Sequence, residues 1–346
     1  MARLKYLAPG SRSAAGSRAL LVLAAWLVVG AAAADTLAEV RERGYLRCGI
    51  QEGAPGFSTI DERGERVGFD IDHCKTIAAA VFGELKIEYI PITPHTVFTL
   101  LQTGGLDIYP GSATWSFSRD VGIGVDYAGV YFYAGQSVVV RRSAGVTSLV
   151  DLDGATICVG QGTTNERNVA DYFGLRGLRY IALTFADEDK GLQAYRVDRC
   201  DAFSTGRVSI AGRIANWPDR NEHVILSDLI VREPLGPVVR QDDPRWRDIA
   251  FWAFNAQIAA EELGVSQANV DDMRASSSNP DVRRMLGVDA DLGAALGLER
   301  DWAYWIIKLV GNYGDTWDRH FTPLGLDRGI NANWRDGGLH VAMPFR

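Results

Sequence analysis

The chain of 346 residues lacks several features that would assign a protein to a class at once. It has no block of like charge, and 43 acidic against 36 basic side chains leave a formal charge of −7. A general nucleic-acid binder is therefore not expected, because phosphate contact needs a basic face. The 37 glycines and 12 prolines follow no short period, which excludes collagen-like, coiled-coil and low-complexity chains. A hydrophobic fraction of 47% excludes intrinsic disorder and is sufficient to form buried cores, and the length predicts roughly two domains.

Residues suited to metal binding and catalysis are also scarce. There are five histidines, and none of the four cysteines lies in a C-x-x-C motif, so a zinc site is disfavoured. No G-x-S-x-G elbow is present. The glycine-rich turn over 160–164 is not followed by lysine, so it is not a P-loop. We expect no catalytic residue, no metal and no cofactor.

The first 34 residues differ from the rest of the chain. Four basic residues precede the first acid, at positions Arg3, Lys5, Arg12 and Arg18. An uncharged stretch follows over 19–34 and ends in Ala32-Ala33-Ala34. Basic, apolar and small segments in this order are typical of a secretory signal peptide. A membrane anchor is disfavoured because the stretch is shorter than the ~20 residues that span a bilayer, and we expect cleavage near Ala34 and a soluble, exported product.

Strand and helix patterns alternate after residue 44. Strands are expected over 45–50, 66–69, 86–90, 106–109, 156–159, 178–183 and 201–204. Helices are expected over 75–82 (capped by Asp72), 96–102, 165–173, 187–195 and 246–263. This alternation is typical of α/β folds with helices on both faces of open sheets. The order helix, turn, Asp, strand occurs twice, which predicts two similar lobes.

Two extended segments are expected to connect these lobes. Residues 131–142 lead from the first to the second, and the Pro-bounded segment 234–240 leads back. We therefore predict a discontinuous first lobe over 35–140 and 238–346, with a C-terminal helical extension, and an inserted second lobe over 141–237. Ligands of open α/β sheets bind beyond the carboxyl ends of the strands, so the lobes would enclose a cleft and the crossings would act as a hinge.

The four cysteines fit export, because disulfides persist outside the cytoplasm. Three pairings are possible. Cys48 and Cys74 flank one strand–helix unit, and Cys158 and Cys200 flank a similar later one. We expect the pairs Cys48–Cys74 and Cys158–Cys200, each contributing roughly 2–4 kcal/mol. The alternative, four free thiols, is disfavoured by export.

Two features could bind an anion, one in each expected lobe. Arg119 follows the strand 106–109, where a guanidinium can hold a carboxylate through two parallel hydrogen bonds. The alternative is an exposed arginine paired with Asp120. The turn over 160–164 offers backbone N–H groups and the hydroxyls of Thr163 and Thr164. Its alternative is N-capping by one of these threonines, and the residues alone leave both alternatives open.

Many short blocks occur in one order along residues 38–346. They include Arg47-Cys48-Gly49-Ile50, Gly68-Phe69-Asp70-Ile71-Asp72, Ser118-Arg119-Asp120, Cys158-Val159-Gly160-Gln161-Gly162-Thr163-Thr164, Glu233-Pro234-Leu235-Gly236-Pro237 and Gly311-Asn312-Tyr313-Gly314. In these blocks the chain resembles the periplasmic solute-binding proteins of ABC importers, family 3, in the longer general L-amino-acid-binding subgroup. The resemblance implies a two-lobe Venus-flytrap fold of type II that closes on a free amino acid.

The resemblance also implies roles for individual residues. Arg119 would clamp the ligand carboxylate, helped by Thr114 and the turn with Thr163 and Thr164. Ser112 would offer its carbonyl to the ligand ammonium. The side chain of the ligand would be surrounded by Gln51, Glu52, Phe57 and Phe98.

One departure from the family concerns the ammonium. The family usually places an aspartate where this chain has Gly206. Either Glu52, Asp228 or Glu233 replaces it, or the ligand is not an ordinary α-amino acid. In the second case Arg207 would contact a further acidic group of the ligand. A simpler alternative is a shift of register that leaves Arg207 in solvent.

These observations predict a periplasmic binding protein that captures a small carboxylate-bearing ligand, above all an L-amino acid, by hinge closure. It would deliver this ligand to an ABC permease in the inner membrane. The alternatives are a binder of a dicarboxylate, oxo acid or hydroxy acid, and a dehydratase-like enzyme on the same fold. A monomer without a nucleic-acid partner is expected.

Overall fold

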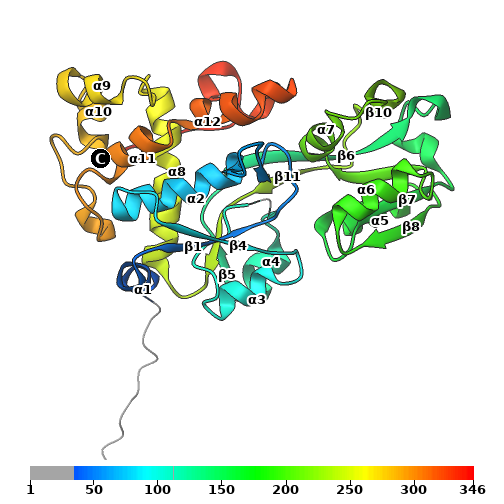
Figure 1. The fold of residues 1–346 in the computed structure, drawn as a ribbon, viewed down its shortest axis with the longest axis horizontal. Coiled ribbons are helices and arrows are strands. Elements are labelled where there is room, and N and C mark those ends of the chain that lie inside the picture. Colours follow the sequence, from blue (N-terminus) through cyan, green and yellow to red (C-terminus); the bar gives the residue numbers. More distant parts are fainter. Residues whose placement is uncertain (1–34, 112) are drawn as a thin grey trace, which may run out of the picture. The chain divides into compact units, whose positions relative to one another are not determined.

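The computed structural model describes residues 35–111 and 113–346. Within them, strands are interspersed with helices as far as β12, and only helices follow (Figure 1). The strands are β1 (Leu46–Ile50), β2 (Thr59–Ile60), β3 (Arg66–Val67), β4 (Ile87–Pro91), β5 (Val125–Tyr127), β6 (Phe132–Arg141), β7 (Thr156–Gly160), β8 (Ile181–Phe185), β9 (Ala202–Gly206), β10 (His223–Ile225), β11 (Val231–Leu235) and β12 (Val238–Arg240). The helices are α1 (Thr36–Arg43), α2 (Phe69–Phe82), α3 (Val97–Gln102), α4 (Phe117–Gly122), α5 (Thr164–Leu175), α6 (Glu188–Arg196), α7 (Arg207–Ile214), α8 (Pro244–Glu262), α9 (Val270–Ser276), α10 (Pro280–Met285), α11 (Trp302–Leu309) and α12 (Tyr313–His320).

The strands of the first part pair in short groups. β1 and β4 are parallel, from Leu46 opposite Ile87 to Ile50 opposite Pro91. β5 and β12 are antiparallel. The segment 106–109 was expected to be a strand and instead makes isolated bridges, Cys48 to Ile108 and Tyr109 to Val238. The carboxyl ends of β1 and of this segment therefore come to one edge.

A core of buried side chains lies between these strands and the C-terminal helices. The helices α2, α8 and α11 contact one another (Figure 1). Trp246 and Ile306 are fully buried in this cluster, together with Cys48 and Cys74 of β1 and α2. The C-terminal helices thus extend the core of the first part of the chain.

A second, six-stranded sheet has the order β10-β6-β9-β7-β8, and β11 also pairs with β6. β7 runs parallel to β8 and β9, whereas β6 is antiparallel to its neighbours. Val138 and Val140 lie in one buried cluster with α5, and Val139 lies in another with α6 and α7. This alternation follows from the two-residue period of a strand, and it confirms helices on both faces.

The two extended segments lie side by side, since β11 pairs with β6 from Phe132 opposite Leu235 to Gln136 opposite Val231. The whole of β6 belongs to the six-stranded sheet, so this sheet begins at Phe132. The lobe boundaries at 140/141 and 237/238 stay a prediction.

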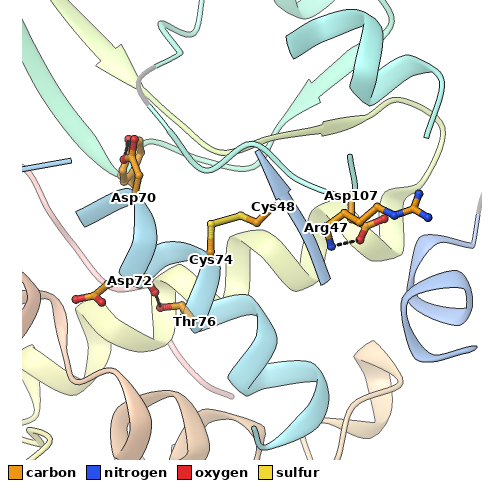
Figure 2. The surroundings of a disulfide bond; sticks show 8 residues. Arg47, Cys48, Asp70, Asp72, Cys74, Thr76 and Asp107 are labelled. Carbon is orange, nitrogen blue, oxygen red and sulfur yellow. Dashed lines mark hydrogen bonds between the residues drawn. A yellow bond between two sulfur atoms is a disulfide. The ribbon is translucent and has the colours of Figure 1, made fainter. Parts of the chain in front are cut away.

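Both expected disulfides are present. Cys48 joins Cys74 with a Cα–Cα distance of 5.9 Å, and Cys158 joins Cys200 at 5.7 Å. Figure 2 shows the first bridge between β1 and α2. Each bridge ties a strand to a neighbouring segment of its own unit, as the sequence predicted.

The expected cap of α2 is wrong. The helix begins at Phe69, well before the expected start at residue 75, and Gly68 is its N-cap. Gly68 has φ +136°, and a Cβ there would lie 2.1 Å from the carbonyl oxygen of Phe57, so glycine is required. The carboxylate of Asp72 instead accepts hydrogen bonds from Lys75 at 3.0 Å and from His320 at 2.7 Å.

The described residues fall in one compact unit, Ala34–Arg346. Among its helices, none is both long enough and apolar enough to cross a membrane. The expected signal peptide over 1–34 lies outside the described residues.

Candidate ligand-binding site

A cavity of about 100 Å³ is lined by residues of the six-stranded sheet, by loop residues and by Gln51, which directly follows β1. It lies beyond the carboxyl ends of β1 and β9 and against the first turn of α5, where ligands of open α/β sheets are held. A second cavity of about 570 Å³ adjoins it. Both cavities are lined by Gln51, Pro94, Thr163, Glu188 and Arg213.

Eight of the eleven residues predicted to contact a ligand line the first cavity. They are Gln51, Phe57, Phe98, Thr114, Arg119, Thr163, Thr164 and Gly206. Ser112 lies outside the described residues. Glu52 and Arg207 do not line the first cavity, as described below.

Arg119 lies on α4, a six-residue helix that begins after Ser116. Its guanidinium donates a hydrogen bond from Nη1 to the carbonyl oxygen of Thr114 at 3.1 Å and stacks 5.3 Å from the centroid of Phe98. The same carbonyl accepts from the hydroxyl of Tyr127 at 2.8 Å, and burial raises the pKa of Tyr127 to about 12, so this donor keeps its proton. Arg119 is thus half-buried and oriented by its neighbours. We call Phe98, Thr114 and Arg119 the Arg119 wall.

Opposite lies a second group, here called the Glu188 wall, which comprises Thr164, Glu188, Thr205, Gly206 and Arg213. The two walls touch, because the hydroxyls of Thr114 and Thr164 are 3.0 Å apart. Near them, a Cβ at Gly212 would lie 2.8 Å from the Cβ of Pro55. The walls therefore approach closely at the cavity.

The capping alternative for the glycine-rich turn is correct in part. Thr163 is the N-cap of α5 and accepts from the backbone N–H of Glu166 at 3.3 Å. The N–H of Gly162 donates to the carboxylate of Glu166 at 2.7 Å. The turn thus satisfies part of its own hydrogen bonding, while Thr163 and Thr164 still line the cavity.

Two predicted residues do not line the first cavity. Glu52 is exposed, pairs with Arg66 at 2.6 Å and lines the second cavity. Arg207, the first residue of α7, is exposed. The helical period places Ser209 and Arg213, four residues apart, at the cavity instead.

Two further acids were candidates for the missing carboxylate. Asp228 lies elsewhere, where it accepts from Ser148 Oγ at 2.8 Å. Glu233 lines the first cavity and accepts from Asn168 Nδ2 at 2.8 Å.

The sequence interpretation missed Glu188 and Arg213. Arg213 is 4% exposed and donates from Nη2 to Glu188 Oε2 at 3.1 Å, and it also pairs with Asp189. Glu188 Oε1 accepts from the hydroxyl of Thr205 at 3.1 Å. The position of Glu188 in the first turn of α6, beyond a strand of the sheet, could have indicated it.

A further acid lies on α2, buried and outside the cavity lining. Asp70 is 2% exposed, accepts from the hydroxyl of Tyr131 at 2.8 Å, and lies close to Gly111. Burial raises the pKa of Asp70 to about 7, and the hydrogen bond from Tyr131 opposes this only in part. Among the described residues, four charged side chains line the cavity itself, the two guanidinium groups of Arg119 and Arg213 and the two carboxylates of Glu188 and Glu233.

Residues 46–285 match a family described as bacterial extracellular solute-binding proteins, family 3. The glutamate/glutamine/aspartate/asparagine-binding protein BztA of Rhodobacter capsulatus is 44% identical over 329 residues, which are 94% of this chain and 97% of that protein. The general L-amino acid-binding periplasmic protein AapJ of Rhizobium johnstonii is 43% identical, over 93% of this chain and 97% of its own length.

A solved structure extends this likeness to the fold. It is a periplasmic binding protein from Brucella ovis with glutathione bound. It is 42% identical, covers 90% of this chain and all of its own, and has a TM-score of 0.87. The expected two-lobe fold of type II is confirmed by this likeness.

Proposed function

Since the chain belongs to family 3 of the bacterial extracellular solute-binding proteins, we propose that it captures an L-amino acid in the cavity between the Arg119 and Glu188 walls. It delivers the amino acid to an ABC permease. The observation that carries the proposal is the half-buried guanidinium of Arg119, oriented by Thr114 and Phe98 and lining a cavity between two walls that touch. A planar guanidinium binds a carboxylate through two parallel hydrogen bonds.

The ligand is bound by both walls at once. Its carboxylate lies on Arg119, with Thr114, Thr163 and Thr164 as further hydrogen-bonding groups, and Gln51, Phe57 and Phe98 surround its side chain. Ser112 offers its carbonyl to the ammonium. Contacts to both walls exist only when the walls approach, so the ligand favours the closed arrangement over the open one.

Relatives suggest where to look for the ligand. BztA is named for glutamate, glutamine, aspartate and asparagine, and the Brucella ovis protein holds glutathione. A free ammonium and a free carboxylate on one carbon are common to all five compounds. These five compounds form the first panel of candidates for this chain.

The remaining properties follow the same proposal. The protein is a monomer in the periplasm, with a signal peptide that is cleaved near Ala34. It returns its ligand unchanged and is not an enzyme. It needs no cofactor.

The test is a thermal-shift screen of the mature protein with the panel, with 2-oxo acids and with dicarboxylates. A bound ligand raises the unfolding temperature by mass action, and a compound that does not bind leaves it unchanged. We expect at least one L-amino acid to stabilise the protein, and recovery of the ligand without chemical change. Stabilisation by 2-oxo acids alone, or turnover of the ligand, would overturn the proposal.

A further inference from the structure

Position 206 offers no carboxylate to a ligand ammonium, yet the cavity contains two acids, Glu188 and Glu233, among the described residues. An ammonium taken out of water needs a negative partner, because its desolvation otherwise costs several kcal/mol. The two acids differ in how close they lie to position 206, and this decides which of them can replace the missing carboxylate.

Glu188 lies next to position 206, where the family's aspartate is replaced by glycine. Its Oε1 accepts from the hydroxyl of Thr205, the residue directly before Gly206, at 3.1 Å. A Cβ built on Gly206 would meet no heavy atom within 4 Å, so there is room for a ligand group beside this carboxylate. The side chain of Glu188 is 14% exposed and lines the cavity.

Glu233 lies further away. Gly206 pairs with Gln136 across β9 and β6, whereas Glu233 pairs with Ala134 across β6 and β11. Glu233 is therefore two strands from Gly206 and displaced along the sheet by two residues. Strands lie about 4.8 Å apart and residues about 3.3 Å along a strand, so the two backbones are separated by roughly 12 Å.

Arg213 fixes the position of Glu188. It is 4% exposed and donates to Glu188 Oε2 and to Ser209 Oγ, each at 3.1 Å. It also pairs with Asp189. Its donors are thus directed at protein groups, which leaves Arg213 little capacity for a second ligand carboxylate. Each carboxylate oxygen has two acceptor sites, so Glu188 Oε1 can accept from a ligand in addition to Thr205.

We propose that Glu188 receives the α-ammonium of the ligand in place of the carboxylate that is absent at position 206, and that Arg213 and Thr205 are its positioning residues. The assignment rests on the proposed function. It makes the site selective for α-amino acids although position 206 is glycine.

The experiment measures dissociation constants by calorimetry for L-glutamate and for 2-oxoglutarate, which differ in an ammonium or a carbonyl at one carbon. It compares the wild type with Glu188→Gln and with the matched control Glu233→Gln, which makes the same change of charge in the same cavity. We expect Glu188→Gln to weaken L-glutamate at least about 30-fold, as for the loss of a buried charge partner. We expect the same variant to change 2-oxoglutarate less than about threefold, and Glu233→Gln to change either ligand less than about threefold.

A second variant distinguishes the loss of a negative charge from a general disturbance of the site. Glu188→Gln combined with Gly206→Asp returns a carboxylate to the site, and we expect it to recover at least about tenfold in affinity for L-glutamate. If Glu188→Gln binds L-glutamate as the wild type does, or if Glu233→Gln shows the large loss, the assignment of Glu188 is overturned while the proposed function stands. If the wild type binds no panel compound, the proposed function itself fails.

Discussion

The two walls of the cavity differ in how their charged groups are held. On the Arg119 wall, a cation is oriented by a backbone carbonyl and an aromatic ring, and no carboxylate among the described residues pairs with it. On the Glu188 wall, the cation Arg213 is paired with Glu188 and Asp189. In the proposed function, Arg119 therefore keeps its remaining donors for a ligand, whereas Arg213 uses its donors to orient an acid. Two arginines in one cavity thus have different roles because their neighbours differ.

The first prediction tests whether Arg119 and Arg213 have different roles in ligand binding. Arg119→Met removes the carboxylate clamp, and we expect affinity for L-glutamate to fall more than about 100-fold. Arg213→Met acts only through Glu188, and we expect a loss of about tenfold. Calorimetry measures both. Arg245→Ala, at an exposed arginine of α8, is the control and should leave affinity unchanged. Equal losses for both methionine variants would contradict the difference in roles.

The second prediction tests whether the close approach of the two walls contributes to affinity. Gly212→Val places a side chain against Pro55, whose Cβ and carbonyl oxygen lie within 3.0 Å of the added Cβ, so the walls cannot approach. We expect affinity for L-glutamate to fall roughly 30-fold, because contacts to both walls favour the closed arrangement.

The control for this change is Gly174→Val on α5, where a Cβ would meet no heavy atom within 4 Å. This control should bind as the wild type does, and both variants should unfold within a few degrees of each other. Unimpaired binding by Gly212→Val would show that closure does not carry the affinity.

The third prediction concerns the buried acid Asp70, whose pKa is shifted in the opposite direction to that of Asp72 on the same helix. Figure 2 shows Asp70 and Asp72 leaving the start of α2 in different directions. Burial raises the pKa of Asp70 from 3.8 to about 7. Burial also acts to raise that of Asp72, but the hydrogen bond and charge of His320, with Lys75 and Arg319, outweigh it and lower the pKa to about 2.

The two shifts give opposite dependences of stability on pH. Between pH 4 and 7 the native state holds a proton on Asp70 that the unfolded chain has lost, so this group makes stability fall as pH rises. Asp72 contributes stability above pH 4 that is lost as pH falls toward 2.

We expect Asp70→Asn to remove the decline between pH 4 and 7, and to stabilise the protein at pH 7 by on the order of 4 kcal/mol relative to the wild type. Asp72→Asn should instead destabilise it at pH 7. Urea unfolding at several pH values tests both variants, and an unchanged slope in Asp70→Asn would refute the assignment.

The fourth prediction concerns position 206, where the family's aspartate is replaced by glycine. Gly206→Asp on the otherwise unchanged chain adds a carboxylate where a Cβ has open space. Because Glu188 already serves the ammonium, we expect only about a threefold gain in affinity for L-glutamate, near 0.7 kcal/mol. A gain of 100-fold would show that the ammonium had no partner before.

The fold and the Arg119 wall could be predicted from the sequence to a large extent. Local patterns predict β7, α5 and both disulfides. Arg119 belongs to the block Ser118-Arg119-Asp120, which resembles the family. The expected start of α2 is wrong because Gly68 is fixed by a close backbone approach to Phe57, a contact that the helix pattern itself does not contain. The isolated bridges of 106–109 likewise depend on tertiary pairing with Val238.

The Glu188 wall was harder to predict for a physical reason. Its charged groups come from the first turn of α6 and the second turn of α7, and they meet only once both helices pack on the same face of the sheet. Arg207 was named because it follows Gly206 in sequence, whereas the helical period brings Arg213 to the cavity. Sequence neighbours of a missing residue are thus poor guides to what replaces it.

The most direct measurement is a crystal structure of the protein with L-glutamate bound. The account predicts the α-carboxylate about 3 Å from the guanidinium of Arg119 and the α-ammonium about 3 Å from the carboxylate of Glu188, with both walls in contact with one ligand. A ligand whose carboxylate lies away from Arg119, or which touches only one wall, would contradict it.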